Sequence, residues 1–331
     1  QYEKISFQDP LKKMVAKALM SLLACCSSAQ SYACKAGVID SCVERMKHIY
    51  AELHLESVKT GRNAHRRKVE NSMRELKMIL EMLRNCLYQH NECKAVATDL
   101  RLAVVLLAFW PWLLLDDLTM AAALELLCVY TANCTAACSA LCFSSSSSSV
   151  SVGSVQPVLP KTAVTNSLMH AVMKLASQVA PDNSSIHSLA FSLLANLAIS
   201  RDGKGLLLKL LVELTQSKHS SAKPTVLLIL HNICFCSANK PKVLANDKAV
   251  ELLVSCLSSS SSDIRNIGAS ALWALLHNNQ KAKATLKCPS IRLKVEEAFV
   301  SARKDEEQSN DKAVNIYHLK CLRNLSNIFN S

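Results

Sequence analysis

The sequence predicts an all-α fold in which helical repeats stack into an α-solenoid, and three observations predict it. Only 6 of the 331 residues are Gly and 8 are Pro, and aromatic residues make up 5%, whereas sheets need turn residues and favour aromatic positions. Apolar residues recur at helical spacing over long stretches, which places them on one face of each helix. Similar phrases also return at steps of about 36 to 50 residues, as expected for stacked helical repeats.

The N-terminal block, residues 1–142, is expected to hold the first repeats. Segment 22–46 has the order helix end, short gap, lysine, helix, and 82–100 is a weaker copy of the repeat. Leading into the second of these segments, apolar residues that are adjacent or three to four positions apart line one helix face. These residues are Leu76, Ile79, Leu80, Leu83 and Leu87.

The apolar stretch 102–115, LAVVLLAFWPWLLL, raises the question of a membrane span. It is 14 residues long, whereas a spanning helix needs about 20. We therefore expect a buried helix hairpin with a bend at Pro111, and no membrane among the partners. Further along, Cys134, Cys138 and Cys142 lie four positions apart among Ala and Ser, which predicts a close contact between two helices.

The main break in the chain is 143–162, where a run of six serines is followed by a glycine and two prolines. This composition buries too little apolar surface to become ordered, so a flexible loop is expected. A C-terminal block of repeats, 163–331, follows it. In that block Asp247 and Asp263 are predicted helix N-caps, and the serines of 258–262 form a tight connection between two helices.

Three helices of the C-terminal block end in related phrases: SLLANLAIS (192–200), LLILHNICFCS (227–237) and LWALLHNNQ (272–280). A lysine follows each phrase after a short gap, and then another apolar run begins. KCLRNLSNIF (320–329) is a last copy. The shared pattern Leu-x-Asn-Leu resembles the armadillo repeat, and HEAT repeats have the same helical period. The expected fold class is therefore an armadillo/HEAT-like α-solenoid.

The armadillo resemblance implies which residues face a partner. In armadillo proteins that bind extended peptides, the repeat asparagine hydrogen-bonds the peptide backbone. The matching positions here are Asn196, Asn232 and Asn324. Together with Lys204 and Lys240, from the lysines that follow the repeat phrases, they form the candidate protein-binding surface.

The sequence departs from that family pattern in two ways. Ala274 replaces the asparagine in LWALL, and Ser192, Leu228 and Lys320 stand where carrier-type armadillo proteins have tryptophan. An irregular solenoid that docks folded or helical partners is therefore expected, rather than a regular peptide-reading groove. Trp273 is expected to be buried between adjacent repeats.

The phrase HNICFCSANK (231–240) places a histidine and two cysteines within six positions. On a helix, Cys234 and Cys236 point about 200° apart, so with His231 they cannot converge on one ion. We expect Cys234 to fill an apolar slot beside Ile233, and we expect most of the 15 cysteines to be buried, reduced thiols. No catalytic motif is recognisable. We therefore expect no enzyme activity, no metal, no cofactor and no small-molecule substrate.

The formal charge of +12 permits acidic partners. The densest basic stretch is 59–70, and its candidate basic patch consists of Arg62, Arg66, Arg67 and Lys68. Two interpretations stay open: a nuclear localisation signal or acidic-partner patch, and a solvated helix start. Because a Gly-rich phosphate loop and a base-stacking aromatic pattern are missing from the sequence, nucleic acid is not expected as a partner.

A longer resemblance lies near the C-terminus, over 232–257, 267–299 and 316–325. These segments resemble the C-terminal region of the rotatin family, very large armadillo-like proteins of centrioles and ciliary basal bodies. The resemblance implies a non-catalytic scaffold in the cytoplasm and at the centrosome, which binds centriolar proteins and acts in centriole assembly, ciliogenesis and left–right axis determination. Because the chain also starts without Met, we expect it to be part of a longer protein. The alternative is a soluble armadillo-type transport adaptor that recognises linear peptide signals.

Overall fold

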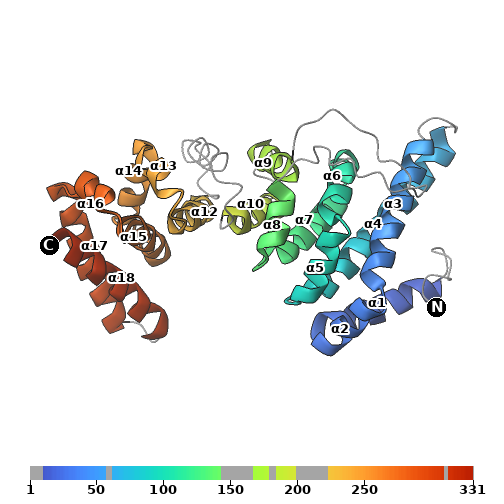
Figure 1. Ribbon diagram of the computed structural model, residues 1–331, viewed down its shortest axis with the longest axis horizontal. Coiled ribbons are helices and arrows are strands. Elements are labelled where there is room, and N and C mark those ends of the chain that lie inside the picture. The colour runs from blue at the N-terminus through green and yellow to red at the C-terminus, as the bar shows by residue number, and fades with distance from the viewer. Residues whose placement is uncertain are drawn as a thin grey trace. The chain divides into compact units, whose positions relative to one another are not determined.

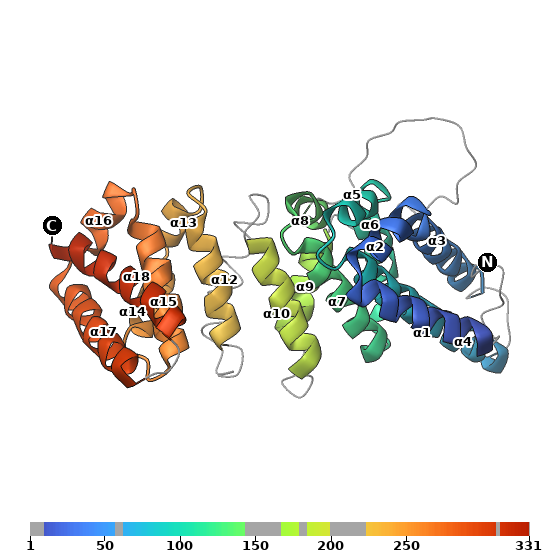
Figure 2. The same cartoon turned by 90° about the horizontal axis from the view of Figure 1, so that it is seen from below.

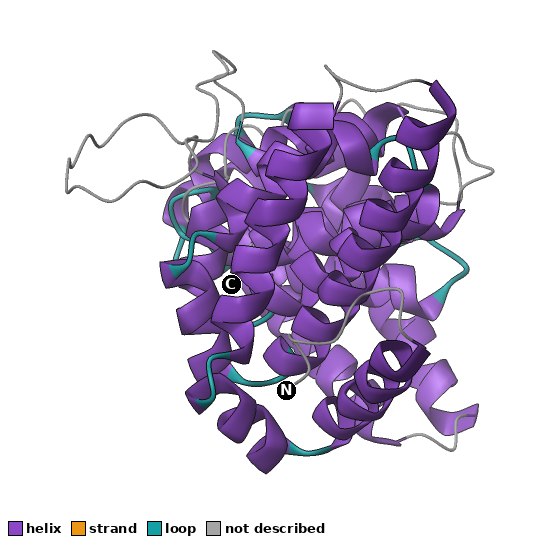
Figure 3. Ribbon diagram, turned by 90° about the vertical axis from the view of Figure 1, so that its right-hand side faces the viewer, coloured by secondary structure: helices purple, strands orange, loops and turns teal. Residues whose placement is uncertain are grey.

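The computed structural model describes residues 10–56, 62–142, 167–178, 184–198, 223–308 and 312–330. Within these ranges all regular structure is helical (Figure 3), which confirms the predicted all-α class. The serine-rich segment 143–162 and Lys204 lie outside the described residues.

The chain forms two compact units, Gln1–Asn196 and Leu197–Ser331. In the first unit, helix α1 is followed by groups of three helices, each beginning with a short one (Figure 1). The bounds in this unit are α1 (Pro10–Cys25), α2 (Ser27–Lys35), α3 (Val38–Glu56), α4 (Arg62–Leu87), α5 (Asn91–Asp99), α6 (Leu102–Leu113), α7 (Asp117–Thr131), α8 (Thr135–Cys142), α9 (Leu168–Gln178) and α10 (Ser184–Ala198).

The second unit repeats this order within its described residues. Helix α12 is followed by two groups of three, and each group again begins with its shortest helix. The bounds are α12 (Lys223–Phe235), α13 (Lys240–Leu244), α14 (Asp247–Cys256), α15 (Ser262–Leu276), α16 (Gln280–Leu286), α17 (Pro289–Gln308) and α18 (Lys312–Asn330).

Helices that hold the same place in the three-helix repeat (first, second or third) pack against one another from one repeat to the next. In the first unit the third helices α4 and α7 make the most extensive contact, and α1 packs on α4 in the same way (Figure 2). The first helices α2, α5 and α8 form a second row, and the second helices α3, α6 and α9 a third. In the second unit α12, α15 and α18 are the stacked third helices. Three-helix repeats whose corresponding helices stack on one another form the α-solenoid predicted from the sequence.

A left-handed residue marks the junction between repeats. Gln89, Asn133 and Asn278 have φ of 53°, 53° and 51°, and each lies two residues after the end of a third helix. Residues of this conformation end helices and turn the chain sharply. Because the junctions align the repeats with one another, Asn85 and Ala274 are seen to occupy the same repeat position, two residues before the end of their helices.

The predicted apolar face of α4 is confirmed, because all five of its leucine and isoleucine positions are at most 6% exposed. The segment 258–262 does connect α14 to α15. Two N-caps were predicted slightly too late in the chain: the capping positions are Asn246, whose side chain accepts from the amide of Ala249, and Ser261.

The apolar stretch 102–115 is one helix and a turn rather than a hairpin. Helix α6 runs through Pro111, and seven of its residues are buried. Among the described residues, each helix taken singly is too short or too polar to cross a membrane. Helices α5 and α6 have the required length and hydropathy only as a pair, and they are bent by 72° relative to each other.

Candidate protein-binding surface

Asn196 on α10 is used inside the protein. Its Nδ2 donates to the backbone carbonyl of Cys128 at 3.0 Å and to the hydroxyl of Thr131 at 3.1 Å. Both acceptors lie in the last turn of α7, and the Cys128 carbonyl also accepts from the C-cap amide of Ala132. Because an amide nitrogen has two hydrogens, Asn196 has none left for a bound peptide in this conformation.

Asn85 on α4 has a similar role two repeats earlier. Its Nδ2 donates to the carbonyl of Met20 on α1 at 2.8 Å. The sequence analysis did not single out Asn85, although LRNCL follows the Leu-x-Asn pattern. In the first unit this asparagine therefore bonds to the preceding stacked helix in two cases: from α4 to α1 and from α10 to α7.

The other two asparagines lie in the second unit. Asn232 is partly exposed, and its Oδ1 lies 3.0 Å from Nδ1 of His231. Asn324 is partly exposed on α18. Both stay candidates for contact with a partner.

The lysine after a third helix also works between repeats. Nζ of Lys94 donates to the carbonyl of Ala132 at 2.6 Å, and Nζ of Lys240 donates to the carbonyl of His277 at 2.9 Å. Ala132 and His277 are the C-caps of the third helices in the following repeats. A cation at a helix C-terminus is favourable, so these lysines stabilise the stacking. Burial lowers the pKa of Lys94.

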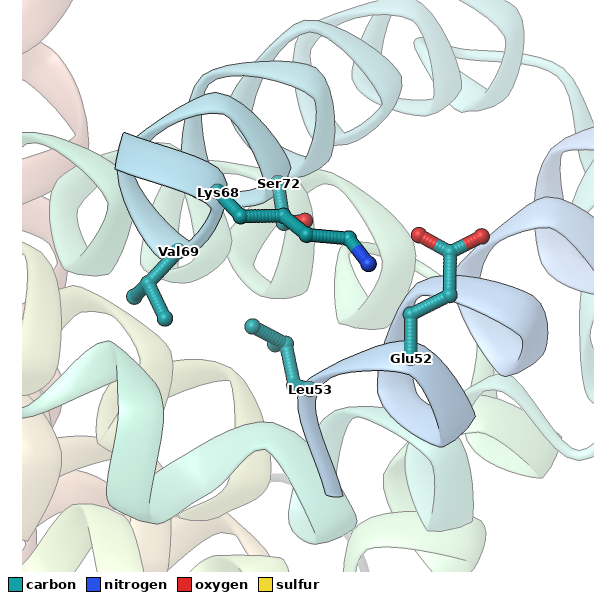
Figure 4. A pocket seen from close by; sticks show the side chains of 5 residues that line it. All are labelled: Glu52, Leu53, Lys68, Val69 and Ser72. Carbon is teal, nitrogen blue, oxygen red and sulfur yellow. The ribbon is translucent and has the colours of Figure 1, made fainter. Parts of the chain in front are cut away.

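The predicted basic patch lies at the start of α4. Arg67 and Lys68 are exposed, whereas the side chains of Arg62 and Arg66 lie outside the described residues. Lys68 points toward Glu52 of α3 across a shallow hollow, which is also lined by Leu53, Val69 and Ser72 (Figure 4). This hollow has about 160 Å³ of empty space, open solvent included, which is below the usual 300–1,000 Å³ of small-molecule sites.

An apolar and aromatic surface covers neighbouring third helices of the second unit. On α12, Leu228 and Phe235 are 39% and 47% exposed, and their spacing of seven residues places them on one helix face. On α15, Trp273 is partly exposed, and His277 at the C-cap of this helix is exposed. We call the set Leu228, His231, Phe235, Trp273 and His277 the α12–α15 face.

His231 connects the two helices of this face. Its Nε2 lies 3.0 Å from Oγ of Ser270 on α15, and its ring centroid is 4.8 Å from that of Phe235. Trp273 stacks at a tilt on His277, with 5.0 Å between ring centroids. Burial lowers the pKa of His231, and its hydrogen bond to Asn232 opposes this. The neutral ring can then accept from the Ser270 hydroxyl.

Cys234 lies behind this face and is fully buried. Burial raises the pKa of its thiol to about 12. Among the residues that the structure describes, no three His, Cys, Asp or Glu side chains are placed to hold a metal ion. All 15 cysteines are free thiols, but only seven are buried, fewer than expected.

The sequence analysis did not identify Leu228 and Phe235 as surface residues, and it expected Trp273 to be buried. A signal was present: VLLIL, residues 226–230, has no polar face. A helix that is apolar on all sides exposes part of its apolar surface wherever no other helix covers it.

Three comparisons with known proteins complete the description. No family model matches the chain. Rotatin of Homo sapiens is 41% identical over 384 aligned residues, which cover 100% of this chain and 17% of the relative. Rotatin of Mus musculus is 40% identical over 381 residues, covering 99% of this chain and 17% of the relative. The chain therefore spans about 17% of the length of the curated relatives it matches.

The solved structures agree on the fold. A designed armadillo repeat protein has a TM-score of 0.52 at 13% identity, covering 86% of this chain and 99% of that one. An engineered protein has a TM-score of 0.50 at 16% identity, covering 86% and 97%. Over its own full length the chain is thus similar to a part of rotatin, and its fold is that of armadillo-repeat solenoids.

Proposed function

We propose that this chain is a non-catalytic, protein-binding segment of a scaffold of centrioles and ciliary basal bodies, acting in centriole assembly, ciliogenesis and left–right axis determination. The observation that carries the proposal is homology to rotatin over the whole chain. The cytoplasmic and centrosomal location and the centriolar partners rest on the rotatin resemblance.

A scaffold needs a rigid body and a free surface. Rigidity is supplied by the polar side chains between repeats, since Asn85, Asn196, Lys94 and Lys240 all bond to a neighbouring repeat. The free surface in this proposal is the α12–α15 face. Exposed aromatic residues on a rigid helix layer are the usual anchors of protein interfaces.

The occupant we propose is an amphipathic helix of a partner protein with acidic residues at its edges. Its apolar side chains would cover Leu228, Phe235 and Trp273. Lys240 and the exposed Lys242 lie on α13, which packs against α12, and the chain carries a formal charge of +12. An acidic rim is therefore electrostatically complementary.

The test is localisation of the tagged chain in ciliated cells, with proximity labelling of its neighbours. We compare the unmodified chain with the double variant Leu228→Ser and Phe235→Ser. A matched control, Leu293→Ser and Val300→Ser, removes two apolar residues that are exposed at 56% and 54% on α17. Centriolar enrichment that the first variant loses and the control keeps would support the proposal.

A diffuse or nuclear signal with labelled transport factors would instead favour the adaptor. Attention would then shift to Arg67 and Lys68 on α4 and to Asn232 and Asn324. Equal loss in both variants would contradict a specific role of the α12–α15 face while leaving the scaffold proposal in place.

A further inference from the structure

Thiols from four helices lie near one another where the first repeat after α1 meets the next repeat. Cys34 lies on α2, Cys42 on α3, Cys86 on α4 and Cys93 on α5. Cys42, Cys86 and Cys93 are buried, whereas Cys34 is partly exposed. Cys34 is close enough to Cys86 and Cys93 to act electrostatically on both thiols.

Within this group, Cys34 and Cys93 are direct neighbours. Sγ of Cys93 donates to the backbone carbonyl of Gln30 at 3.7 Å. In helix α2 that carbonyl is also the acceptor for the amide four residues later, which is the amide of Cys34. The Cys93 sulfur therefore lies against the helical turn that carries Cys34, and the two thiols are close enough to act on each other electrostatically.

The two thiols differ in access to solvent, because Cys34 is partly exposed and Cys93 is buried. Burial, together with the neighbouring Cys34 thiol, raises the pKa of Cys93. Attack on a disulfide requires a thiolate and access to it. Cys34 therefore meets a soluble reagent first, and Cys93 is placed to react second.

We propose that Cys34 and Cys93 are a modification site, at which exchange with a small-molecule disulfide such as oxidised glutathione forms a reversible disulfide between α2 and α5. In the first step Cys34 loses its proton, its sulfur bonds to one glutathione sulfur, and the glutathione disulfide bond breaks, releasing one glutathione thiolate. In the second step Cys93 loses its proton, attacks the Cys34 sulfur and expels the other glutathione thiolate. The two protons end on the two glutathione thiolates, so the protein loses two electrons and oxidised glutathione gains them.

The bond would join the first helices of two consecutive repeats. Helices α2 and α5 already pack against each other, and the closed loop would contain α3 and α4. Oxidation would thus hold two stacked repeats together at one edge and slow the local opening of their helices.

To test this, the whole chain is equilibrated in mixtures of reduced and oxidised glutathione, quenched in acid, alkylated with a maleimide and digested for mass spectrometry. We expect a linked peptide containing Cys34 and Cys93, lighter than the reduced pair by two hydrogens and separated by a dithiol reductant. Amide exchange in α2 and α5 should slow in the oxidised chain.

Single variants separate the two roles. In Cys93→Ser we expect Cys34 to stop as the mixed disulfide with glutathione, and in Cys34→Ser we expect Cys93 to stay reduced. Cys288→Ser, which removes a partly exposed thiol in the other unit, serves as control and should keep the linked peptide. If Cys93→Ser does not fold, Cys93→Ala replaces it, and the linked peptide of the unmodified chain is measured without any variant.

The proposal is overturned if Cys93 is never linked while other thiols become glutathionylated. It is equally overturned if Cys93 pairs with Cys86 instead, or if Cys34 in the unmodified chain remains a stable mixed disulfide.

Discussion

Gly268 on α15 lies where α14 comes closest, and replacing it with alanine tests how tightly the second unit is packed. A Cβ atom at this position would lie 2.5 Å from Cβ of Cys256 and 3.1 Å from the backbone carbonyl of Leu253. Both atoms belong to α14, and neither is the end of a flexible side chain. The substitution therefore forces the two helices apart.

Two opposing terms set the size of the effect. Alanine in place of glycine inside a helix contributes about 1 kcal/mol of stability. Inserting a carbon into a filled contact costs about 1–3 kcal/mol, and more where backbone atoms are involved. Because a 2.5 Å contact cannot be relieved by a side-chain rotation, the cost should exceed the gain. We expect Gly268→Ala to destabilise the second unit by about 1–2 kcal/mol.

The assay is urea unfolding followed by circular dichroism, together with amide exchange of peptides from α14 and α15. The partner variant is Cys256→Gly, which removes the clashing Cβ. Contacting residues couple in a double-mutant cycle, so the double variant Cys256→Gly and Gly268→Ala should be more stable than the sum of the two single changes predicts.

Two results would refute the reasoning. Gly268→Ala could raise the free energy of unfolding by about the helix-propensity value, or the cycle could show no coupling between the two positions. Either would mean that α14 and α15 are further apart than described.

Three other predictions concern polar groups. Glu75 is nearly buried and accepts from Arg45 at 2.9 and 2.7 Å, so Glu75→Gln should destabilise the first unit by about 1–2 kcal/mol, less in high salt; an unchanged urea midpoint would contradict the pairing. Lys94→Met keeps the packed stem but leaves the carbonyl of Ala132 without its ammonium donor, so the free energy of unfolding should fall by about 1–2 kcal/mol. The loss should appear as faster amide exchange at the end of α7, and equal exchange in the variant would contradict this role of Lys94. Burial holds the pKa of His231 below its ordinary 6.5, so the unfolded chain binds more protons just below that pH. Stability should therefore be fully present above pH 6.5 and fall as the pH drops through that value, and His231→Gln should flatten this slope; an identical slope in the variant would contradict it.

The helical faces could be predicted from the sequence because they depend on local spacing alone. Leu76, Leu80 and Leu83 are fully buried as expected, since a residue's position on a helix follows from its number. Helix starts were predicted less accurately. Asn246 and Asp247 are adjacent and cap helices almost equally well, so propensity did not choose between them.

The roles of the repeat asparagines and lysines could not be predicted, because they depend on which atoms of another repeat lie within reach. Nothing in SLLANLAIS says that the amide of Asn196 meets the carbonyl of Cys128, 68 residues earlier. The same holds for Lys240 and the carbonyl of His277, 37 residues later. The resemblance to peptide-binding armadillo proteins assigned Asn196 to a partner, and the repeat pattern added Lys240, whereas stacking of the repeats uses both side chains internally.

Because these two side chains bond within the stack of repeats, a partner must be recognised by other parts of the surface. Where asparagine and lysine side chains bond to the neighbouring repeat, a partner finds few free polar groups in a regular row. The third helices α12 and α15 of the second unit do expose apolar and aromatic side chains: Leu228, Phe235 and part of Trp273. An extended peptide is recognised mainly through its backbone hydrogen bonds, and an amphipathic helix mainly through its apolar side chains. Since the described surface offers apolar contacts on α12 and α15 and bonds Asn196 and Lys240 within the stack, it favours a helical partner over an extended one.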